Sequence, residues 1–183
     1  MKRINVGVIG TGWTGGIRAN ACARSPLIDE LHIAEINPDR LAEVKGETDP
    51  AFATTDWEEL LKKDELETII ISATPESTHY PMIKAALEAG KHVLCEARMA
   101  MNAAEARAML TASQAHPDLV AQLVPAPFDF KGRKTIARML SEGELGDLRE
   151  VQVTILNGGA LAETPLHWRE QRRYSGENVM IFG

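Results

Sequence analysis

Three glycines and one acid near the start of the chain have the types and spacing that hold a dinucleotide. Gly10, Gly12 and Gly15 follow an apolar run, and Glu35 lies at the end of the next apolar run. In such a unit the first glycine makes a tight turn, the second lets a pyrophosphate approach the backbone, and the third lets the helix pack on the strand. The helix N-terminus attracts phosphate, and the acid accepts hydrogen bonds from ribose hydroxyls.

The neighbours of these residues refine the predicted cofactor site. Thr11 and Trp13 lie inside the glycine loop, where we expect both to contact the cofactor, although core packing is an equal alternative for Trp13. A carboxylate at Glu35 repels a 2′-phosphate and therefore favours NAD over NADP. Arg40 follows one turn into the next predicted helix. The simplest interpretation of Arg40 is a solvated side chain, but its positive charge leaves NADP as an alternative cofactor.

The rest of the first 124 residues predicts the scaffold that positions these groups. Apolar runs alternate with amphipathic segments, which is typical of βαβ units and a parallel sheet. The fold class is therefore α/β, with an N-terminal doubly wound Rossmann domain over 1–124. The expected strands are 4–9, 31–36, 51–54, 68–72, 91–95 and 119–124.

Local signals predict where some helices begin and end. Asn37 and Pro38 are typical of a helix start, and Gly46 is a plausible stop for that helix. Asp56 and Glu59 have the spacing of a capping pair on the following helix.

Two further strand ends carry candidate site residues. Thr74 and Pro75 follow the strand 68–72, and Glu96 follows the strand 91–95. Doubly wound sheets bind ligands at the carboxyl ends of their strands. We therefore expect all three residues to contact the cofactor, with Glu96 near the nicotinamide ribose.

A second domain is predicted to begin at residue 125. Pro125 and Pro127 interrupt regular structure, and a helix over 131–142 and a strand over 149–156 follow. One helix and one strand cannot bury their own apolar faces. Residues 125–183 are thus expected to be the start of an α/β open-sheet substrate domain. Either the chain is part of a longer protein, which we favour, or another chain completes the domain.

Composition restricts the partners and the compartment. The formal net charge is −6 and no run of Lys or Arg occurs, which argues against nucleic acid. No apolar run approaches the ~20 residues of a membrane helix, and the N-terminus lacks the features of a signal peptide. Cys22 and Cys95 are too few for a disulfide framework, and no metal-ligand pattern occurs. We expect a cytoplasmic protein without a metal.

Several segments together resemble one oxidoreductase family. The glycine loop is joined by the Ala-Thr-Pro-x-x-x-His segment 73–79, the segment 85–93 and the pair Cys95-Glu96. This combination resembles the Gfo/Idh/MocA oxidoreductases, and the segments 143–148 and 167–169 resemble that family's second domain. The resemblance implies a Rossmann domain that binds NAD or NADP, a second domain that holds a sugar, cyclitol or similar polyol, hydride transfer between the two, and homo-oligomers.

The chain departs from the family pattern at the positions that carry catalysis. Ala97 stands where the family has a lysine, and Arg98 stands where it has a proline, so a cis turn is not expected there. Ile181 stands at the position of a substrate-contacting aspartate. Alanine and isoleucine cannot take a proton, which leaves Arg98 to steady an alkoxide electrostatically. His79 is a second catalytic and cofactor-binding candidate, although a helix-start histidine satisfied by the backbone is the simpler interpretation.

Three functions remain open from the sequence. The first is an NAD(P)-dependent oxidoreductase acting on a sugar-like or cyclitol substrate. The second is a catalytically altered dinucleotide-binding or sensing protein, because of Ala97 and Ile181. The third is a non-redox reaction through transient oxidation, which would leave the amount of NAD unchanged.

Overall fold

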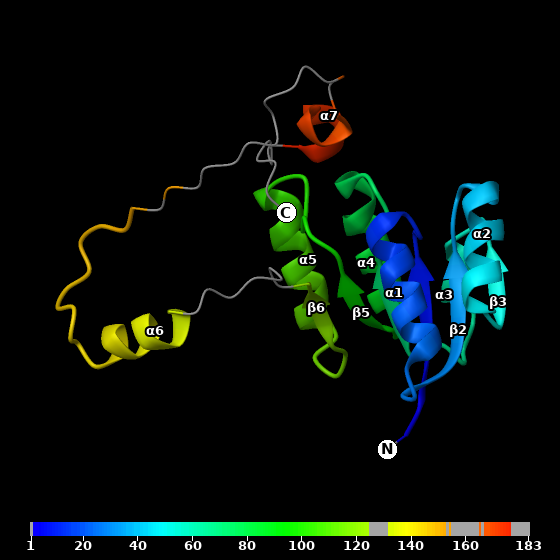
Figure 1. Cartoon of the computed structure of the whole chain (residues 1–183), viewed down its shortest axis with the longest axis horizontal. Helices are drawn as coiled ribbons and strands as arrows, with labels where there is room; N and C mark the ends of the chain where they lie inside the picture. Colours follow the sequence, from blue (N-terminus) through cyan, green and yellow to red (C-terminus); the bar gives the residue numbers. More distant parts are fainter. Residues whose placement is uncertain (1, 125–131, 153, 155–164, 166, 177–183) are drawn as a thin grey trace. The chain divides into compact units, whose positions relative to one another are not determined.

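A single parallel sheet organises the N-terminal part of the chain (Figure 1). The computed structural model describes residues 2–124, 132–152, 154, 165 and 167–176. The sheet has the strand order β3-β2-β1-β4-β5-β6, and every neighbouring pair is parallel. The strands are β1 (Ile4–Ile9), β2 (Ile28–Ala34), β3 (Phe52–Thr54), β4 (Thr68–Ile71), β5 (His92–Cys95) and β6 (Ala121–Leu123). This order is that of a doubly wound Rossmann fold, so the predicted fold class is confirmed.

Helices cover both faces of the sheet. The Rossmann helices are α1 (Trp13–Arg24), α2 (Pro38–Thr48), α3 (Glu58–Leu61), α4 (His79–Glu88) and α5 (Ala103–Ala115), with a short 3₁₀ turn η1 (Glu76–Thr78) before α4. Ala19 of α1 and Val44 of α2 pack on one face with Val8 and Ile33. The helices α3, α4 and α5 contribute to a second core cluster with Ile69 and other strand residues. Both faces of the sheet are thus buried, as expected for a parallel sheet.

The register of the strands brings three loops to the same edge. The amide of Gly10 donates to the carbonyl oxygen of Ala34 at 2.8 Å, and the amide of Ser72 donates to that of Ile9 at 2.8 Å. The amide of Glu96 donates to the carbonyl oxygen of Ile71 at 2.9 Å. These bonds continue the strand ladders by one residue, so the loops after β1, β4 and β5 begin side by side.

The helix-boundary predictions are partly confirmed. The Asn37 side chain caps α2 by accepting hydrogen bonds from the amides of Asp39 and Arg40. Gly46, however, does not end α2, which continues to Thr48 and ends at Asp49 with φ 45°. The helix has no positive-φ requirement at Gly46, so its interior hydrogen bonds continue through the glycine.

The expected capping pair on α3 does not form. Asp56 accepts a hydrogen bond from the amide of Glu58 at 2.9 Å, but the Glu59 carboxylate accepts one from the hydroxyl of Thr54 at 2.5 Å. Thr54 ends the adjacent strand β3, and its hydroxyl oxygen also accepts a hydrogen bond from the amide of Asp56 at 3.1 Å, which leaves that amide satisfied without Glu59.

The remaining chain divides between two compact units. The described residues between 132 and 165 belong to the second unit, and the described residues 167–176 group with the Rossmann unit. The second unit contains α6 (Arg133–Ser141). The Rossmann unit also contains η2 (Trp168–Glu170) and α7 (Arg172–Ser175), and a side chain at Gly176 would collide with the carbonyl of Met101.

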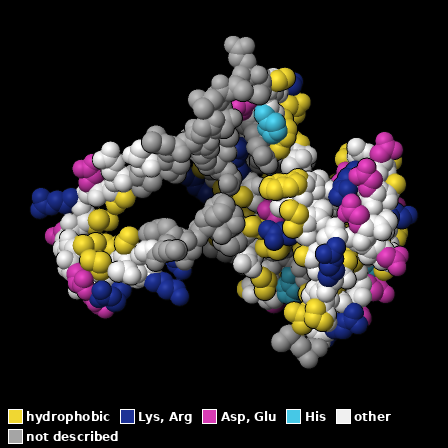
Figure 2. All heavy atoms as spheres, viewed as in Figure 1, with side chains coloured by type: hydrophobic (Ala, Val, Ile, Leu, Met, Phe, Trp, Pro, Cys, Tyr) yellow, Lys and Arg dark blue, Asp and Glu magenta, His cyan; other side chains and the backbone are white. Residues whose placement is uncertain are grey.

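The strand predicted over 149–156 is wrong for the residues that the structure describes there. Residues 149–152 and 154 have no regular structure, and the Val151 side chain is 69% exposed. Figure 2 shows apolar side chains at the surface of this unit, around α6. A strand needs a neighbouring strand for its backbone hydrogen bonds, and the described part of this unit contains none.

Candidate cofactor site

The three glycines of the loop after β1 have different surroundings. Gly10 has φ +80°, and a Cβ there would lie 2.6 Å from the Cα of Ala73. A Cβ on Gly15 would overlap the carbonyl of Gly10 and lie 3.0 Å from the Cβ of Ser72. A Cβ on Gly12 would meet nothing within 4 Å. Gly10 and Gly15 are therefore required by the fold, whereas Gly12 leaves open space beside the loop.

The N-terminus of α1 is prepared for an anion. Gly12 is its N-cap residue and offers no side-chain hydrogen bond, and its first turn carries no acidic residue. The first amides of the helix are therefore not capped by a side chain, and the helix dipole places partial positive charge there. A pyrophosphate approaching over Gly12 would meet both features.

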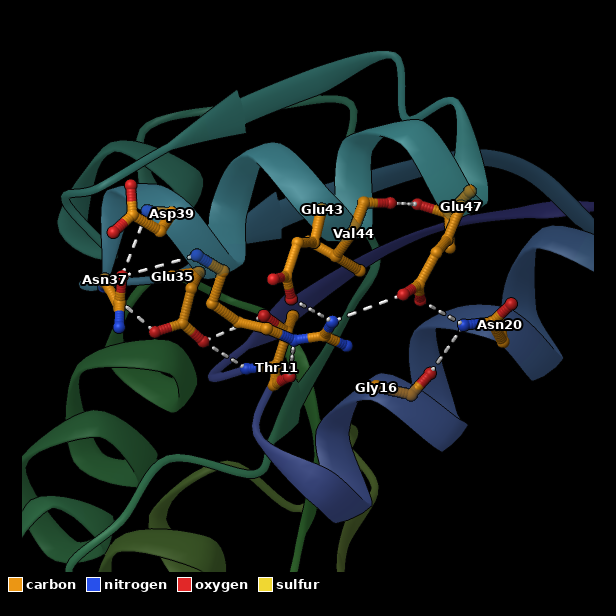
Figure 3. Close-up of polar contacts among 11 residues, drawn as sticks. Thr11, Gly16, Asn20, Glu35, Asn37, Asp39, Glu43, Val44 and Glu47 are labelled. Carbon is orange, nitrogen blue, oxygen red and sulfur yellow. Dashed lines mark hydrogen bonds and ion pairs between the residues drawn. The ribbon is translucent and has the colours of Figure 1, made fainter.

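Glu35 is tied to the glycine loop. Its side chain is 7% exposed, and one carboxylate oxygen accepts hydrogen bonds from the amide and hydroxyl of Thr11, at 2.6 and 2.8 Å (Figure 3). The other oxygen accepts one from the amide of Asn37 at 3.0 Å. Glu35 thus anchors the loop to the end of β2, a role that the sequence did not reveal. A carboxylate has about four acceptor sites, which leaves capacity for a ribose hydroxyl.

Arg40 also reaches the glycine loop, so the prediction of a solvated side chain is wrong. Its Nε donates to the carbonyl oxygen of Thr11 at 2.8 Å, and its side chain is 27% exposed. Arg40 lies in the first turn of α2, and its long side chain spans the distance to Thr11 of the loop. Thr11 of the loop therefore donates hydrogen bonds to Glu35 and accepts one from Arg40, so both residues hold the loop in place.

A cavity of about 430 Å³ opens at the carboxyl ends of β1, β2 and β4. This is the point where the strand order reverses, at which doubly wound sheets bind ligands. Among the residues that line it are Gly10, Gly12, Glu35, Ile36, Ser72 and Thr74. The buried Ser72 hydroxyl oxygen has no hydrogen-bond partner among the described residues. An open glycine, an uncapped helix N-terminus and an unpartnered hydroxyl together fit a polar, phosphate-bearing ligand such as a dinucleotide.

Other predicted site residues lie outside the lining of this cavity. The Trp13 side chain is 85% exposed, which excludes core packing, and lines an adjoining surface hollow with Gly12 and Arg40. Glu96 is paired with Arg18, whose Nε donates to its carboxylate at 2.6 Å. Arg18 lies on α1, and neither its spacing nor its neighbours indicated this contact from the sequence.

His79 joins two of the loops. Its ring is 2% exposed, with Nδ1 2.7 Å from the carbonyl oxygen of Arg98 and Nε2 2.8 Å from that of Ala73. Both nitrogens face backbone acceptors, so this geometry leaves neither to a substrate. The histidine satisfied by the backbone is the interpretation that fits, and the ring links the loop after β4 to the loop after β5.

Both linked loops contain a cis peptide bond. The Thr74–Pro75 bond is cis, and so is the Ala97–Arg98 bond, which overturns the expectation that the loss of proline removes a cis turn there. Ile181, which stands at the position of the family's substrate-contacting aspartate, lies outside the described residues.

Two searches of the described residues gave no candidates. No helix there has the length and apolar character needed to cross a membrane. Within the same residues, no group of three or more His, Cys, Asp or Glu side chains could hold a metal ion.

The fold and the loop geometry define a dinucleotide-binding Rossmann domain. Comparison with known families then places it: residues 4–122 match the family model described as an oxidoreductase family with an NAD-binding Rossmann fold. The chain belongs to this family, the Gfo/Idh/MocA oxidoreductases.

Curated relatives include dehydrogenases of sugar-like and cyclitol compounds. The chain is 29% identical to a levoglucosan dehydrogenase of Pseudarthrobacter phenanthrenivorans, over 98% of this chain and 48% of that protein. It is 30% identical to the scyllo-inositol 2-dehydrogenase (NADP(+)) IolW of Bacillus subtilis, over 92% of this chain and 45% of that protein. The chain thus spans about half the length of the curated relatives it matches.

A solved structure shares the fold. The scyllo-inositol dehydrogenase of Lactobacillus casei, crystallised with NAD(H) and scyllo-inositol, matches with a TM-score of 0.69 at 22% identity. The match covers 80% of this chain and 43% of that one. At this level of identity the comparison supports the fold.

Proposed function

We propose that this chain is the cofactor-binding part of an NAD(P)-dependent oxidoreductase that transfers hydride between a nicotinamide and a sugar-like or cyclitol substrate. The observation that carries the proposal is the cavity at the strand-order reversal, where the open Gly12, the α1 N-terminus and the unpartnered Ser72 hydroxyl meet. The names of the curated relatives support the reaction and the substrate class.

The residues of the site divide into holding and positioning roles. Gly12 and the first amides of α1 bind the pyrophosphate, and Glu35 accepts a hydrogen bond from the adenosine ribose. Glu96 is oriented by Arg18 for the nicotinamide ribose. His79 acts through the loops it links and is a positioning residue. When bound, the nicotinamide supplies the hydride acceptor.

The proton of the substrate hydroxyl requires a separate group. The half-buried Arg98 follows β5 and steadies a developing alkoxide by its positive charge, but an arginine is too basic to accept a proton near neutral pH. Ala97, exposed beside it, supplies neither function. This observation favours a second candidate, a dinucleotide-binding or sensing protein with altered catalysis.

One experiment separates the two candidates. The chain is mixed with NAD⁺ or NADP⁺ and a panel of polyols and anhydrosugars, and absorbance of the reduced cofactor is followed. Turnover supports the oxidoreductase. Cofactor binding without turnover, together with activity gained by Ala97→Lys, supports the altered protein and contradicts the first proposal.

The wider organisation belongs to the same proposal. Residues 125–183 begin a substrate domain, the protein works in the cytoplasm as a homo-oligomer, and its partners are small molecules and not nucleic acid. Figure 2 shows acidic and basic side chains interspersed on the visible face of the Rossmann unit, which fits the net charge of −6. Light scattering of the purified chain measures the oligomer directly.

A further inference from the structure

The Arg40 guanidinium is bound by two carboxylates of its own helix. Its Nη1 donates to the carboxylate of Glu43 at 2.9 Å and to that of Glu47 at 3.2 Å, while its Nε donates to Thr11. The three acceptors lie on two elements: Thr11 in the glycine loop, and Glu43 and Glu47 on the following turns of α2 (Figure 3). The guanidinium is therefore held in one place beside the loop.

The neighbouring helix α1 reinforces this arrangement. The Asn20 amide donates to the second oxygen of Glu47 at 3.0 Å and to the carbonyl oxygen of Gly16 at 3.1 Å. The hydrogen bond from Asn20, with that from Arg40, holds the pKa of the Glu47 carboxyl below its usual range, so it is ionised at neutral pH. A Cβ on Gly16 would lie 2.7 Å from Nη2 of Arg40, so the guanidinium rests directly against this turn of α1.

These contacts matter because Arg40 lies where the adenosine ribose would bind. Arg40, Glu35 and Gly12 all line the cavity at the strand-order reversal. A 2′-phosphate is recognised by a guanidinium that presents free N–H groups to it. Here Nε and Nη1 already donate to protein acceptors, which leaves Nη2, the nitrogen that faces Gly16 of α1. The carboxylates of Glu43 and Glu47 also place negative charge beside the guanidinium, which disfavours a phosphate there.

We propose that Glu43 and Glu47 are specificity-determining residues that make the site prefer NAD to NADP by holding the Arg40 guanidinium against the glycine loop. The inference rests on the proposed function, because it concerns the same cofactor site. Glu35 repels a 2′-phosphate directly, whereas Glu43 and Glu47 act by engaging the cation that would otherwise bind it.

The test compares cofactor affinities in glutamine variants of the chain. Dissociation constants for NAD⁺ and NADP⁺ are measured calorimetrically at one salt concentration for the wild type and for Glu43→Gln/Glu47→Gln. The control is Glu88→Gln, which removes a carboxylate from an i,i+4 ion pair with Lys84 on α4. Thermal unfolding of each variant shows that it is folded at the temperature used.

The expected results are specific to the cofactor. The wild type binds NAD⁺ more tightly than NADP⁺, and the double variant binds NADP⁺ about tenfold more tightly than the wild type, since one charge-assisted hydrogen bond to phosphate is worth about 1.4 kcal/mol or more. Glu88→Gln leaves the ratio of the two affinities unchanged. If the double variant is unstable, the two single variants each raise NADP⁺ affinity by a smaller factor.

Other results overturn the inference in distinguishable ways. Equal binding of NAD⁺ and NADP⁺ by the wild type, or an unchanged ratio in the glutamine variants, contradicts the role of Glu43 and Glu47 and leaves the proposed function standing. Failure of the wild type to bind either cofactor contradicts both.

Discussion

Gly12 and Gly15 lie three residues apart in the same loop, yet alanine at the two positions should have opposite consequences. At Gly15 the new methyl would overlap the Gly10 carbonyl and press on the Cβ of Ser72. The first obstacle is backbone, which cannot rotate away as a side chain does. At Gly12 the methyl would point into open space at the cavity.

The expected magnitudes follow from these contacts. An extra methyl in a packed site destabilises the fold by about 1–3 kcal/mol, and we expect a value near the upper end of this range where the backbone must move. Alanine in a helix regains at most about 1 kcal/mol over glycine. Gly15→Ala should therefore lose about 2 kcal/mol, which lowers the melting temperature by about 4–8 °C in a chain of this size. Gly12→Ala should change the free energy of unfolding by less than about 1 kcal/mol. Alanine is a poorer N-cap residue than glycine, which lowers stability, but it also reduces the conformational entropy of the unfolded chain, which raises stability.

The assay measures stability and binding separately for each variant. Thermal unfolding without cofactor gives the stability, and calorimetric titration with NAD⁺ gives the affinity. Gly12→Ala should melt near the wild type and bind NAD⁺ at least about tenfold more weakly, because the methyl occupies the approach of the pyrophosphate. Unchanged NAD⁺ affinity of Gly12→Ala would refute the placement of the pyrophosphate, and wild-type stability of Gly15→Ala would refute the packing argument.

Two further predictions concern residues away from the loop. Asn37→Ala removes the side chain that caps α2 and should lower the free energy of unfolding by about 1 kcal/mol, measured by urea unfolding; an unchanged midpoint would contradict the cap. Burial raises the pKa of the Cys95 thiol to about 12, so the folded protein keeps it neutral while the unfolded chain ionises it from about pH 8.5. The contribution of the neutral Cys95 thiol to stability is complete below about pH 8.5 and is lost as the pH rises toward 12. Mass spectrometry after iodoacetamide treatment at pH 8.5 should find the half-buried Cys22 alkylated before Cys95.

The parts of the fold that the sequence predicts are those governed by local pattern. The run 68–72 is apolar and β-branched, and β4 is buried in the middle of the sheet. Asn37 followed by Pro38 predicts a helix start from two residues, and Asn37 caps α2 in the structure. Each of these signals depends on neighbours within one turn or one strand.

The parts that the sequence did not predict depend on tertiary contacts. The bonds from Arg40 to Thr11 and from Arg18 to Glu96 join residues far apart in the chain, and no spacing rule pairs them. The prediction of a strand near Val151 was wrong because alternating apolar residues form a strand only where a neighbouring strand provides hydrogen-bond partners. Both arginines lie one or two turns into the helices that flank the glycine loop, and this position is the sequence signal for such contacts.

The anchoring of the glycine loop changes how its acid should be tested. Glu35 holds Thr11 and Asn37 in addition to its expected contact with the ribose, so its removal disturbs the loop and the ligand together. A loss of affinity in Glu35→Gln would therefore not identify the ribose contact. The loop is fixed in place by Glu35 and Arg40 before any ligand binds, which reduces the ordering required on binding. Gly12, where an added Cβ would meet nothing within 4 Å, is the position where a change in affinity reports the cofactor alone.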